Sequence, residues 1–135
     1  MKIFVCVDDE GGMSFMGRRV SRDRVVTEDI IKTAGGKLII YPYSERLLRE
    51  AGCSPRVSCD ALAAAGDDEW VFIEDRGAGE CLDRIDTVVL YRWNRLYPSD
   101  KKLDFCPTRA GFSLAEATDM VGKSHEKITR EVYKR

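Results

Sequence analysis

The stretch WVFIEDRGAGECLDRIDTVVLYRW (70–93) contains two apolar runs, WVFI at 70–73 and TVVLYRW at 87–93, that are rich in β-branched and aromatic residues. Runs of this kind are typical of buried strands. The segment between them, expected to be helical over 77–84, is long enough for a crossover that returns the second strand parallel to the first. This pattern predicts the α/β fold class.

The flanking sequence continues the alternation of strands and helices. The opening run KIFVCVDD (2–9) predicts a central buried strand that ends at the turn signal Glu10–Gly12, followed by a loop over 13–22. From Asp23 onward, apolar residues recur at helical spacing until Gly35 ends the run. The other expected elements are a strand at 37–41, a helix that Ser44 caps, a short strand at 55–58, a small helix that Asp60 caps, and an antiparallel pair formed by 112–114 and 127–133.

We expect a single α/β domain over residues 1–135, with a mostly parallel central sheet flanked by helices and an antiparallel C-terminal hairpin. A chain of 135 residues supports one hydrophobic core and hardly two. An exposed edge strand in such a sheet leaves a homodimer open as one arrangement.

The charge balance narrows the range of partners. The net charge is −1, whereas binding to nucleic acid usually needs a basic face, so we expect no nucleic-acid partner. No apolar run approaches the roughly 18 residues of a membrane span. The N-terminal stretch also turns acidic too early for a signal peptide. We therefore expect a cytoplasmic protein without a membrane partner.

Cysteine and histidine usage limits the chemistry. The five cysteines contain no Cys-x-x-Cys pair, which argues against a disulfide framework and a zinc knuckle. We expect them to be small buried side chains in a reducing compartment, with a nucleophilic cysteine left open. The single histidine, His125, cannot build a histidine-rich metal site, so any catalytic metal would need oxygen ligands. The scattered acidic residues show no EF-hand pattern, and we expect no metal.

Several segments occur in an order known from another family: KIFVCVDDEGGMSFMGR (2–18), the stretch 70–93, YPSDKKLDF (97–105), GFSL (111–114) and KITREVYKR (127–135). In this order the chain resembles the dihydrofolate reductases, in which a first strand with a mobile loop, a strand-turn-helix-strand run and a closing hairpin follow one another. The resemblance implies a diverged and shortened dihydrofolate reductase-like fold.

The same resemblance implies site residues. In that family an acid at the start of the first helix holds the pterin, which makes Asp23 a catalytic candidate. The family's phosphate-binding Gly-Arg-x-Thr is replaced by YPYS at 41–44. Its Gly-Gly turn is replaced by Glu74 and Asp75, whose carboxylates repel a cofactor phosphate. We therefore expect no NADPH and no other cofactor.

Three further segments, GMSFMGRRVSRDRV (12–25), LYRWNRLYPSD (90–100) and GKSHEKITREVY (122–133), resemble small clostridial-type proteins of anaerobic Gram-positive bacteria. The function of that family is unknown, and its members are often labelled ribonuclease Z. Ribonuclease Z builds a two-zinc centre from clustered histidines and aspartates, which a chain with one histidine cannot supply. The residues do not support the label.

An arginine cluster is the first candidate ligand-binding site. Arg18, Arg19 and Arg22 lie beside Asp23 in the segment expected at the carboxyl edge of the sheet, where ligands bind in open α/β folds. Such a cluster predicts a clamp for a phosphate or carboxylate. The alternative is a solvated loop with internal ion pairs.

A second candidate site combines arginine with aromatic residues. Arg92, Trp93 and Tyr97 lie at the end of a strand expected to be central, and such a mixture predicts stacking on a planar ring. The alternative is an aromatic strand end that covers the core.

His125 is the second catalytic candidate. Imidazole ordinarily titrates near neutral pH, so His125 is suited to act as a general acid or base beside Ser124 or Glu126. Neighbours in a strand point to opposite sides, however, so these three residues are not a ready-made triad. The alternative is a polar entry to the last strand.

The sequence favours a binding or regulatory module for an anionic or planar small molecule, and leaves open whether the protein is an enzyme. The alternatives of the enzyme class are a diverged NADPH-dependent reductase that uses Asp23 and a hydrolase or nuclease that uses His125.

Overall fold

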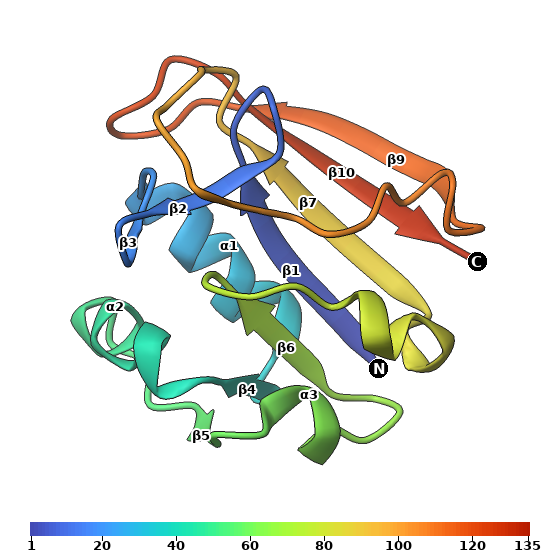
Figure 1. Ribbon diagram of the computed structural model, residues 1–135. Coiled ribbons are helices and arrows are strands. Elements are labelled where there is room, and N and C mark those ends of the chain that lie inside the picture. The colour runs from blue at the N-terminus through green and yellow to red at the C-terminus, as the bar shows by residue number, and fades with distance from the viewer.

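The computed structural model describes residues 1–135, which form two sheets. The larger sheet has seven strands in the order β5-β4-β6-β1-β7-β10-β9 (Figure 1). At its centre β1 (Lys2–Val7) runs parallel to β6 (Trp70–Ile73) and β7 (Thr87–Arg92), whereas the last strand pairs antiparallel with β7. The other strands are β4 (Leu38–Ile40), β5 (Arg56–Val57), β9 (Ser113–Met120) and β10 (Ile128–Lys134). The predicted fold class is confirmed.

The central strand β1 is apolar on both faces. Ile3, Val5 and Val7 pack into one core cluster, and Phe4 packs into the other. Alternate side chains of a strand point to opposite faces, so both faces of the sheet need a cover. The helices α1 (Arg24–Ala34) and α2 (Glu45–Glu50) pack on the Phe4 face. On the other face pack α3 (Ala61–Ala64) and the 3-10 helix η2 (Gly79–Arg84).

Helix α1 begins and ends where the sequence predicts. Asp23 is the N-cap residue, and its carboxylate accepts a hydrogen bond of 2.9 Å from the N–H of Val25. Gly35 ends the helix in the left-handed conformation with a φ of 57°, which glycine adopts without steric strain. No helix of the protein is both long enough and apolar enough to cross a membrane.

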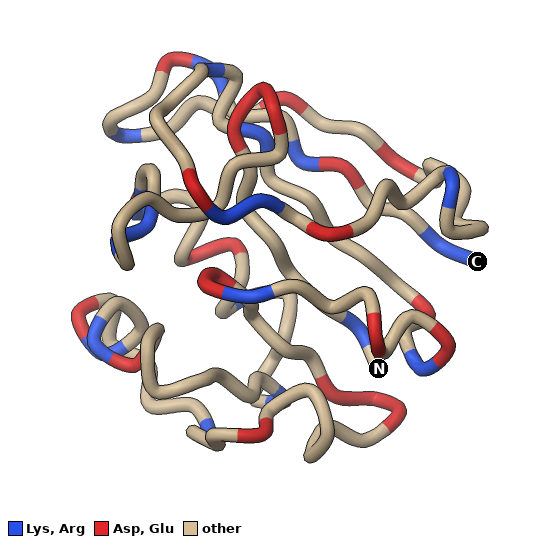
Figure 2. Tube along the Cα trace, viewed as in Figure 1, with Lys and Arg blue, Asp and Glu red and all other residues tan.

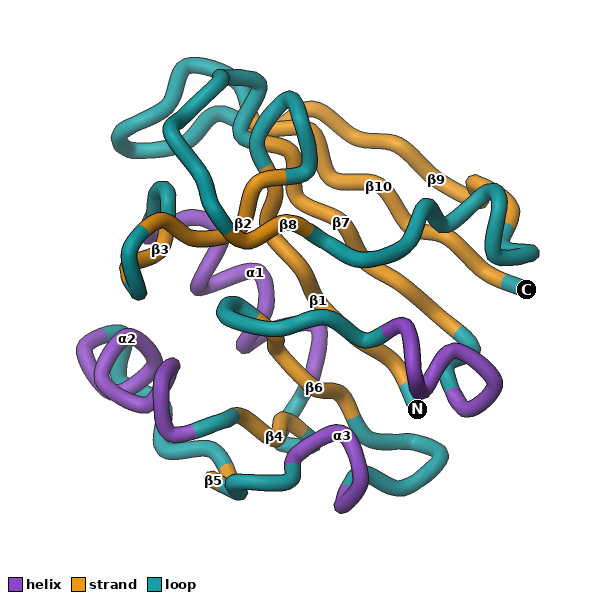
Figure 3. Tube along the Cα trace, viewed as in Figure 1, coloured by secondary structure: helices purple, strands orange, loops and turns teal.

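The segment 13–22, predicted to be a loop, forms a hairpin instead. β2 (Gly12–Phe15) and β3 (Arg18–Arg19) pair across a two-residue turn, and β8 (Lys101–Lys102) completes a three-stranded sheet (Figure 3). Met16 and Gly17 both have a positive φ, as a type I′ hairpin turn requires. Methionine rarely adopts this conformation, so the sequence carries only half of the usual turn signal.

Several smaller predictions are wrong. Ser44 lies at the start of α2, after the 3-10 helix η1 (Pro42–Ser44), but its hydroxyl donates to Glu74 instead of capping the helix. Asp60 precedes α3 without any side-chain cap. Of the cysteines, Cys6, Cys53 and Cys81 are half-buried against the core, whereas Cys59 and Cys106 are exposed. In each case tertiary packing, which local residue preferences do not contain, decides the outcome.

Candidate functional site

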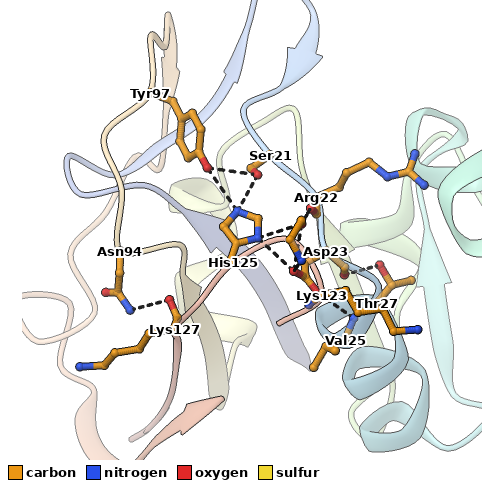
Figure 4. Close-up of polar contacts among 11 residues, drawn as sticks. Ser21, Arg22, Asp23, Val25, Thr27, Asn94, Tyr97, Lys123, His125 and Lys127 are labelled. Atoms are coloured by element: carbon orange, nitrogen blue, oxygen red, sulfur yellow. Dashed lines mark hydrogen bonds and ion pairs between the residues drawn. The ribbon is translucent and has the colours of Figure 1, made fainter. Parts of the chain in front are cut away.

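Three loops meet at His125 at the carboxyl end of the central strands (Figure 4). The first carries Ser21 and Asp23 from the β2–β3 hairpin into α1, the second follows β7 and carries Tyr97, and the third joins β9 to β10. Asp8, at the end of β1, holds the second loop because its carboxylate accepts a hydrogen bond of 3.1 Å from the N–H of Tyr97.

Asp23 ties the first loop to the third. Its carboxylate accepts hydrogen bonds from the backbone N–H groups of Lys123 and Ser124, at 3.1 and 2.8 Å, in addition to the helix-capping bond from Val25. The Ser124 hydroxyl donates to Oδ2 at 3.0 Å, and Nδ1 of His125 lies 3.0 Å from the same oxygen. Gly122 passes so close that a Cβ there has no room beside the carboxylate.

These contacts determine the charge of Asp23. Burial by itself raises the pKa of the carboxyl, but the hydrogen bonds from His125, Lys123, Ser124 and Val25 outweigh burial and hold the pKa well below its usual range. Asp23 is therefore an ionised carboxylate. The Asp23 side chain is 0% exposed. Five donors surround its two oxygens, which offer about four lone-pair sites, so the carboxylate has no acceptor site left for another group.

The charge of Asp23 also determines the tautomer of His125. Because an ionised carboxylate only accepts hydrogen bonds, Nδ1 of the imidazole carries the proton that faces Asp23. In the neutral ring Nε2 is then an acceptor. It lies 2.8 Å from Oγ of Ser21 and 3.2 Å from the hydroxyl oxygen of Tyr97.

The ring of His125 is also fixed by packing. It is buried and stacks on Trp93, with the ring centres 4.7 Å apart and the planes tilted by 24°. The Tyr97 hydroxyl donates to Oγ of Ser21 at 3.3 Å, which gives a continuous series of hydrogen bonds from Tyr97 through Ser21 and His125 to Asp23. We call these four residues the Ser21–His125 relay.

The structure thus brings together Asp23, His125, Trp93 and Tyr97, which the sequence suggested as parts of separate sites. The sequence around Ser21 did not indicate its role, because the arginines on either side of it indicate an anion-binding segment. The available signal was its place two residues before the helix-capping aspartate. Ser124, the expected partner of His125, lies on the Nδ1 side, 3.1 Å away.

Arg92 does not join this site. Adjacent side chains on β7 point to opposite faces of the sheet, so Trp93 packs beside α1 while Arg92 lies on the other face. There its Nε donates to Oε1 of Glu131 at 2.6 Å. The predicted stacking cluster of Arg92 with Trp93 and Tyr97 therefore does not form.

The three predicted arginines of the first cluster line one cavity of about 570 Å³ between the β2–β3 hairpin and α2. In Figure 2, basic segments lie on both sides of this cavity, and α2 carries acidic residues as well. We call it the arginine cavity. Its lining residues are Gly17, Arg18, Arg19, Arg22, Tyr43, Arg46, Leu47 and Glu50.

The arginines of this cavity differ in how far they are already paired. Arg19 donates through Nε and Nη2 to the buried carboxylate of Glu74, at 2.8 and 3.0 Å. Arg22 and Arg46 share the single carboxylate of Glu50, each at 3.1 Å. Arg18 makes no ion pair. Positive charge therefore exceeds negative charge in the wall.

The glycine-containing turn after β6 is occupied by the protein's own carboxylate. Asp104 accepts hydrogen bonds from the N–H groups of Ala78 and Gly79, at 2.9 to 3.1 Å. A Cβ at Gly77 has no room beside that carboxylate. Successive backbone N–H groups of this kind form an anion-binding site, and Asp104 fills it.

This contact gives a testable prediction. Asp104→Ala and Gly77→Ala are each expected to lower the free energy of unfolding by about 1 kcal/mol, because each removes the same hydrogen bonds to the turn. The double variant is expected to lose no more than the worse single variant, since the interaction is lost only once. Urea unfolding of the four proteins measures the effect. Additive losses would show that the two residues act independently.

No group of three or more histidine, cysteine, aspartate and glutamate side chains is arranged to hold a metal ion. No family model matches the chain, and no curated protein matches it in sequence. Among solved structures, it is similar to dihydrofolate reductase from Enterococcus faecalis complexed with NADP(H) and RAB-propyl. The identity is 11% and the TM-score 0.69, over 99% of this chain and 95% of that one. The chain therefore has a dihydrofolate reductase-like fold, as the order of its segments predicts.

Proposed function

We propose that this protein binds a small anionic molecule in the arginine cavity. The observation that carries the proposal is the wall itself, in which four arginines face one glutamate. Guanidinium groups bind phosphates and carboxylates through paired N–H donors, and a concentration of them at one cavity attracts anions. A volume of about 570 Å³ lies in the range of small-molecule sites.

The arginines differ in how available they are to a ligand, because some of them are already paired with carboxylates. Arg18 is free to bind, and Arg22 and Arg46 together carry one more positive charge than their shared Glu50. The hydrogen bonds from Arg22 and Arg46 lower the pKa of Glu50, so this carboxylate stays ionised at neutral pH. Arg19 is committed to Glu74 and serves mainly to hold the wall in place.

An anion suits the cavity better than an uncharged planar ring. Trp93, the aromatic residue expected to stack on a ligand, is buried and stacks on His125. Tyr43 is the aromatic residue of the cavity, and the guanidinium of Arg19 lies over its ring at 5.4 Å. Its hydroxyl donates to the backbone carbonyl of Gly17 at 3.1 Å.

The reductase alternative has less support. A pterin would need the carboxylate of Asp23, whose two oxygens are already surrounded by five donors. A cofactor phosphate would have to approach the Glu74 carboxylate and displace Asp104 from the glycine-containing turn. We accordingly propose a binding protein that works without NADPH.

Calorimetric titration with pyrophosphate and with citrate tests the proposal. Wild-type protein is expected to bind at least one of these anions, and the double variant R18A/R22A is expected to bind it at least about tenfold more weakly. The double variant R95A/R109A, which removes two exposed arginines outside the cavity lining, is the charge-matched control. Equal binding by R18A/R22A and wild type would contradict the proposal. A rise in melting temperature with NADPH would support the reductase alternative instead.

A further inference from the structure

The Ser21–His125 relay has the connectivity of a serine nucleophile with its base. Oγ of Ser21 lies 2.8 Å from Nε2 of His125, and Nδ1 of the same ring lies 3.0 Å from Oδ2 of Asp23. A serine hydroxyl becomes nucleophilic when a histidine accepts its proton and a carboxylate holds that histidine in the right tautomer. Such an arrangement is recognised by geometry and not by position in the sequence.

The direction of the hydrogen bonds agrees with this role. The carboxylate of Asp23 is ionised, so it fixes the ring proton on Nδ1 and leaves the lone pair of Nε2 toward Ser21. The Tyr97 hydroxyl lies 3.3 Å from Oγ of Ser21 and 3.2 Å from Nε2, and when it donates to Oγ the serine proton is left for Nε2. A positive charge formed on the imidazole is stabilised by Asp23.

Ser21 lines a single cavity, which has room for about one water molecule. Ser21 is half-buried, and the wall of this cavity of about 10 Å³ includes Trp93. The indole N–H of Trp93 is the one buried side-chain donor or acceptor without a partner. Arg22 and Leu47 line both this cavity and the arginine cavity.

We propose that Ser21 is the nucleophile of an ester-hydrolysing site, with His125 as general base and Asp23 as the residue that orients it. The preference for an ester with an anionic acyl group rests on the proposed function of the arginine cavity. The serine chemistry does not rest on it, because the distances within the relay carry it independently.

The reaction divides into two balanced halves. Oγ of Ser21 bonds to the ester carbonyl carbon while its proton passes to Nε2 of His125. The bond from that carbon to the alcohol oxygen then breaks, and the leaving oxygen takes the proton from Nε2, which yields an acyl-serine and an alcohol. A water molecule repeats the sequence on the acyl-serine, releases the carboxylic acid and restores Ser21.

Covalent labelling of the full chain with a fluorophosphonate tests the serine chemistry. The expected result is one modification, mapped to Ser21 by peptide mass spectrometry, with fluoride as the leaving group. His125→Gln is expected to slow labelling at least about 100-fold, because the base is lost. Ser113→Ala, at an exposed serine remote from the relay, is expected to label at the wild-type rate. No label on Ser21, or a label on another residue, would overturn the proposal.

Hydrolysis of two p-nitrophenyl esters separates this proposal from the proposed function. Wild-type protein is expected to hydrolyse both the anionic hemisuccinate and the neutral butyrate, and Ser21→Ala neither. R18A/R46A, which changes two arginines that do not line the cavity of Ser21, is expected to lose at least about tenfold in kcat/KM for the hemisuccinate alone. Unchanged hydrolysis of both esters by R18A/R46A would refute the anionic preference and leave Ser21 as the nucleophile. Equal hydrolysis by Ser21→Ala would overturn the serine chemistry.

Discussion

Replacing Asp23 with alanine is expected to lower the melting temperature by roughly 10 °C. The variant removes the N-cap of α1 and leaves the N–H groups of Lys123 and Ser124 without their acceptor. Caps contribute about 1 kcal/mol, and hydrogen bonds to a charged group contribute about 1.5–3 kcal/mol each. Allowing for non-additivity, we expect a loss of about 3 kcal/mol.

Urea unfolding at neutral pH measures this loss, and Asp67→Ala serves as the matched control. Asp67 is an exposed aspartate without a side-chain hydrogen bond or ion pair, so its removal is expected to change stability by less than about 0.5 kcal/mol. A melting temperature of the Asp23 variant within 2 °C of wild type, on the order of half a kcal/mol, would show that the carboxylate does not tie the loops together.

The contribution of Asp23 is expected to depend on pH in one direction. Hydrogen bonds hold its pKa well below the usual range in the folded protein, whereas the unfolded chain has an ordinary aspartate pKa of about 3.9. As the pH falls, the unfolded chain therefore binds the proton first. The stabilisation is fully present above about pH 5 and is lost progressively as the pH falls below about 4 toward the folded pKa.

Asp23→Asn isolates this effect because it keeps the size of the side chain and removes its titration. With His125→Gln present in both proteins, so that no imidazole titrates beside the carboxylate, the difference in unfolding free energy between the protein with Asp23 and Asp23→Asn is expected to be constant from pH 7 to about 5 and to shrink below about pH 4. An increase in this free-energy difference as the pH falls would contradict the expected loss of stabilisation by Asp23.

Replacing Arg19 with methionine is expected to lower the free energy of unfolding by about 2–3 kcal/mol. The Glu74 side chain is only 7% exposed, and without Arg19 it keeps a single side-chain donor, the hydroxyl of Ser44. Breaking a buried pair typically costs about 3–5 kcal/mol. The Arg19 side chain is 23% exposed, which moderates the loss.

A double-mutant cycle distinguishes the lost pair from lost packing. Arg19→Met combined with Glu74→Leu is expected to recover most of the stability, because the buried charge disappears with its partner. Arg22→Met, which breaks the exposed pair with Glu50, is the control and is expected to cost less than about 1 kcal/mol. Losses that simply add in the double variant would show that the Arg19–Glu74 contact contributes little.

The central sheet was largely predictable because its signals are local. The runs that form β1, β6 and β7 are apolar throughout, as strands covered on both faces must be. The helix from Asp23 to Gly35 carries its own start and stop residues. Side chains alternate between the two faces of a sheet along a strand, so Arg92 and Trp93 lie on opposite faces. The sequence itself therefore argued against a stacking site that both residues share.

The β2–β3 hairpin and the relay were not predictable in the same way. Met16 does not favour a positive φ, and its N–H donates to the carboxylate of Asp100, 84 positions away. Ser44 donates to a glutamate thirty positions away instead of capping its own helix. These residues form hydrogen bonds with groups that are distant in the sequence, so local conformational preferences do not determine their roles.

By itself the sequence determined the α/β class, the order of the strands of the larger sheet along the chain, the extent of the first helix, and the presence of an arginine cluster. Only the tertiary structure decided that Ser21 and His125, 104 positions apart, share a hydrogen bond, and that Arg92 lies away from the site. Periodicity and capping act within a few residues. The contacts of the site depend instead on which loops the packed sheet brings to its carboxyl edge, and on the partners that buried polar groups find there.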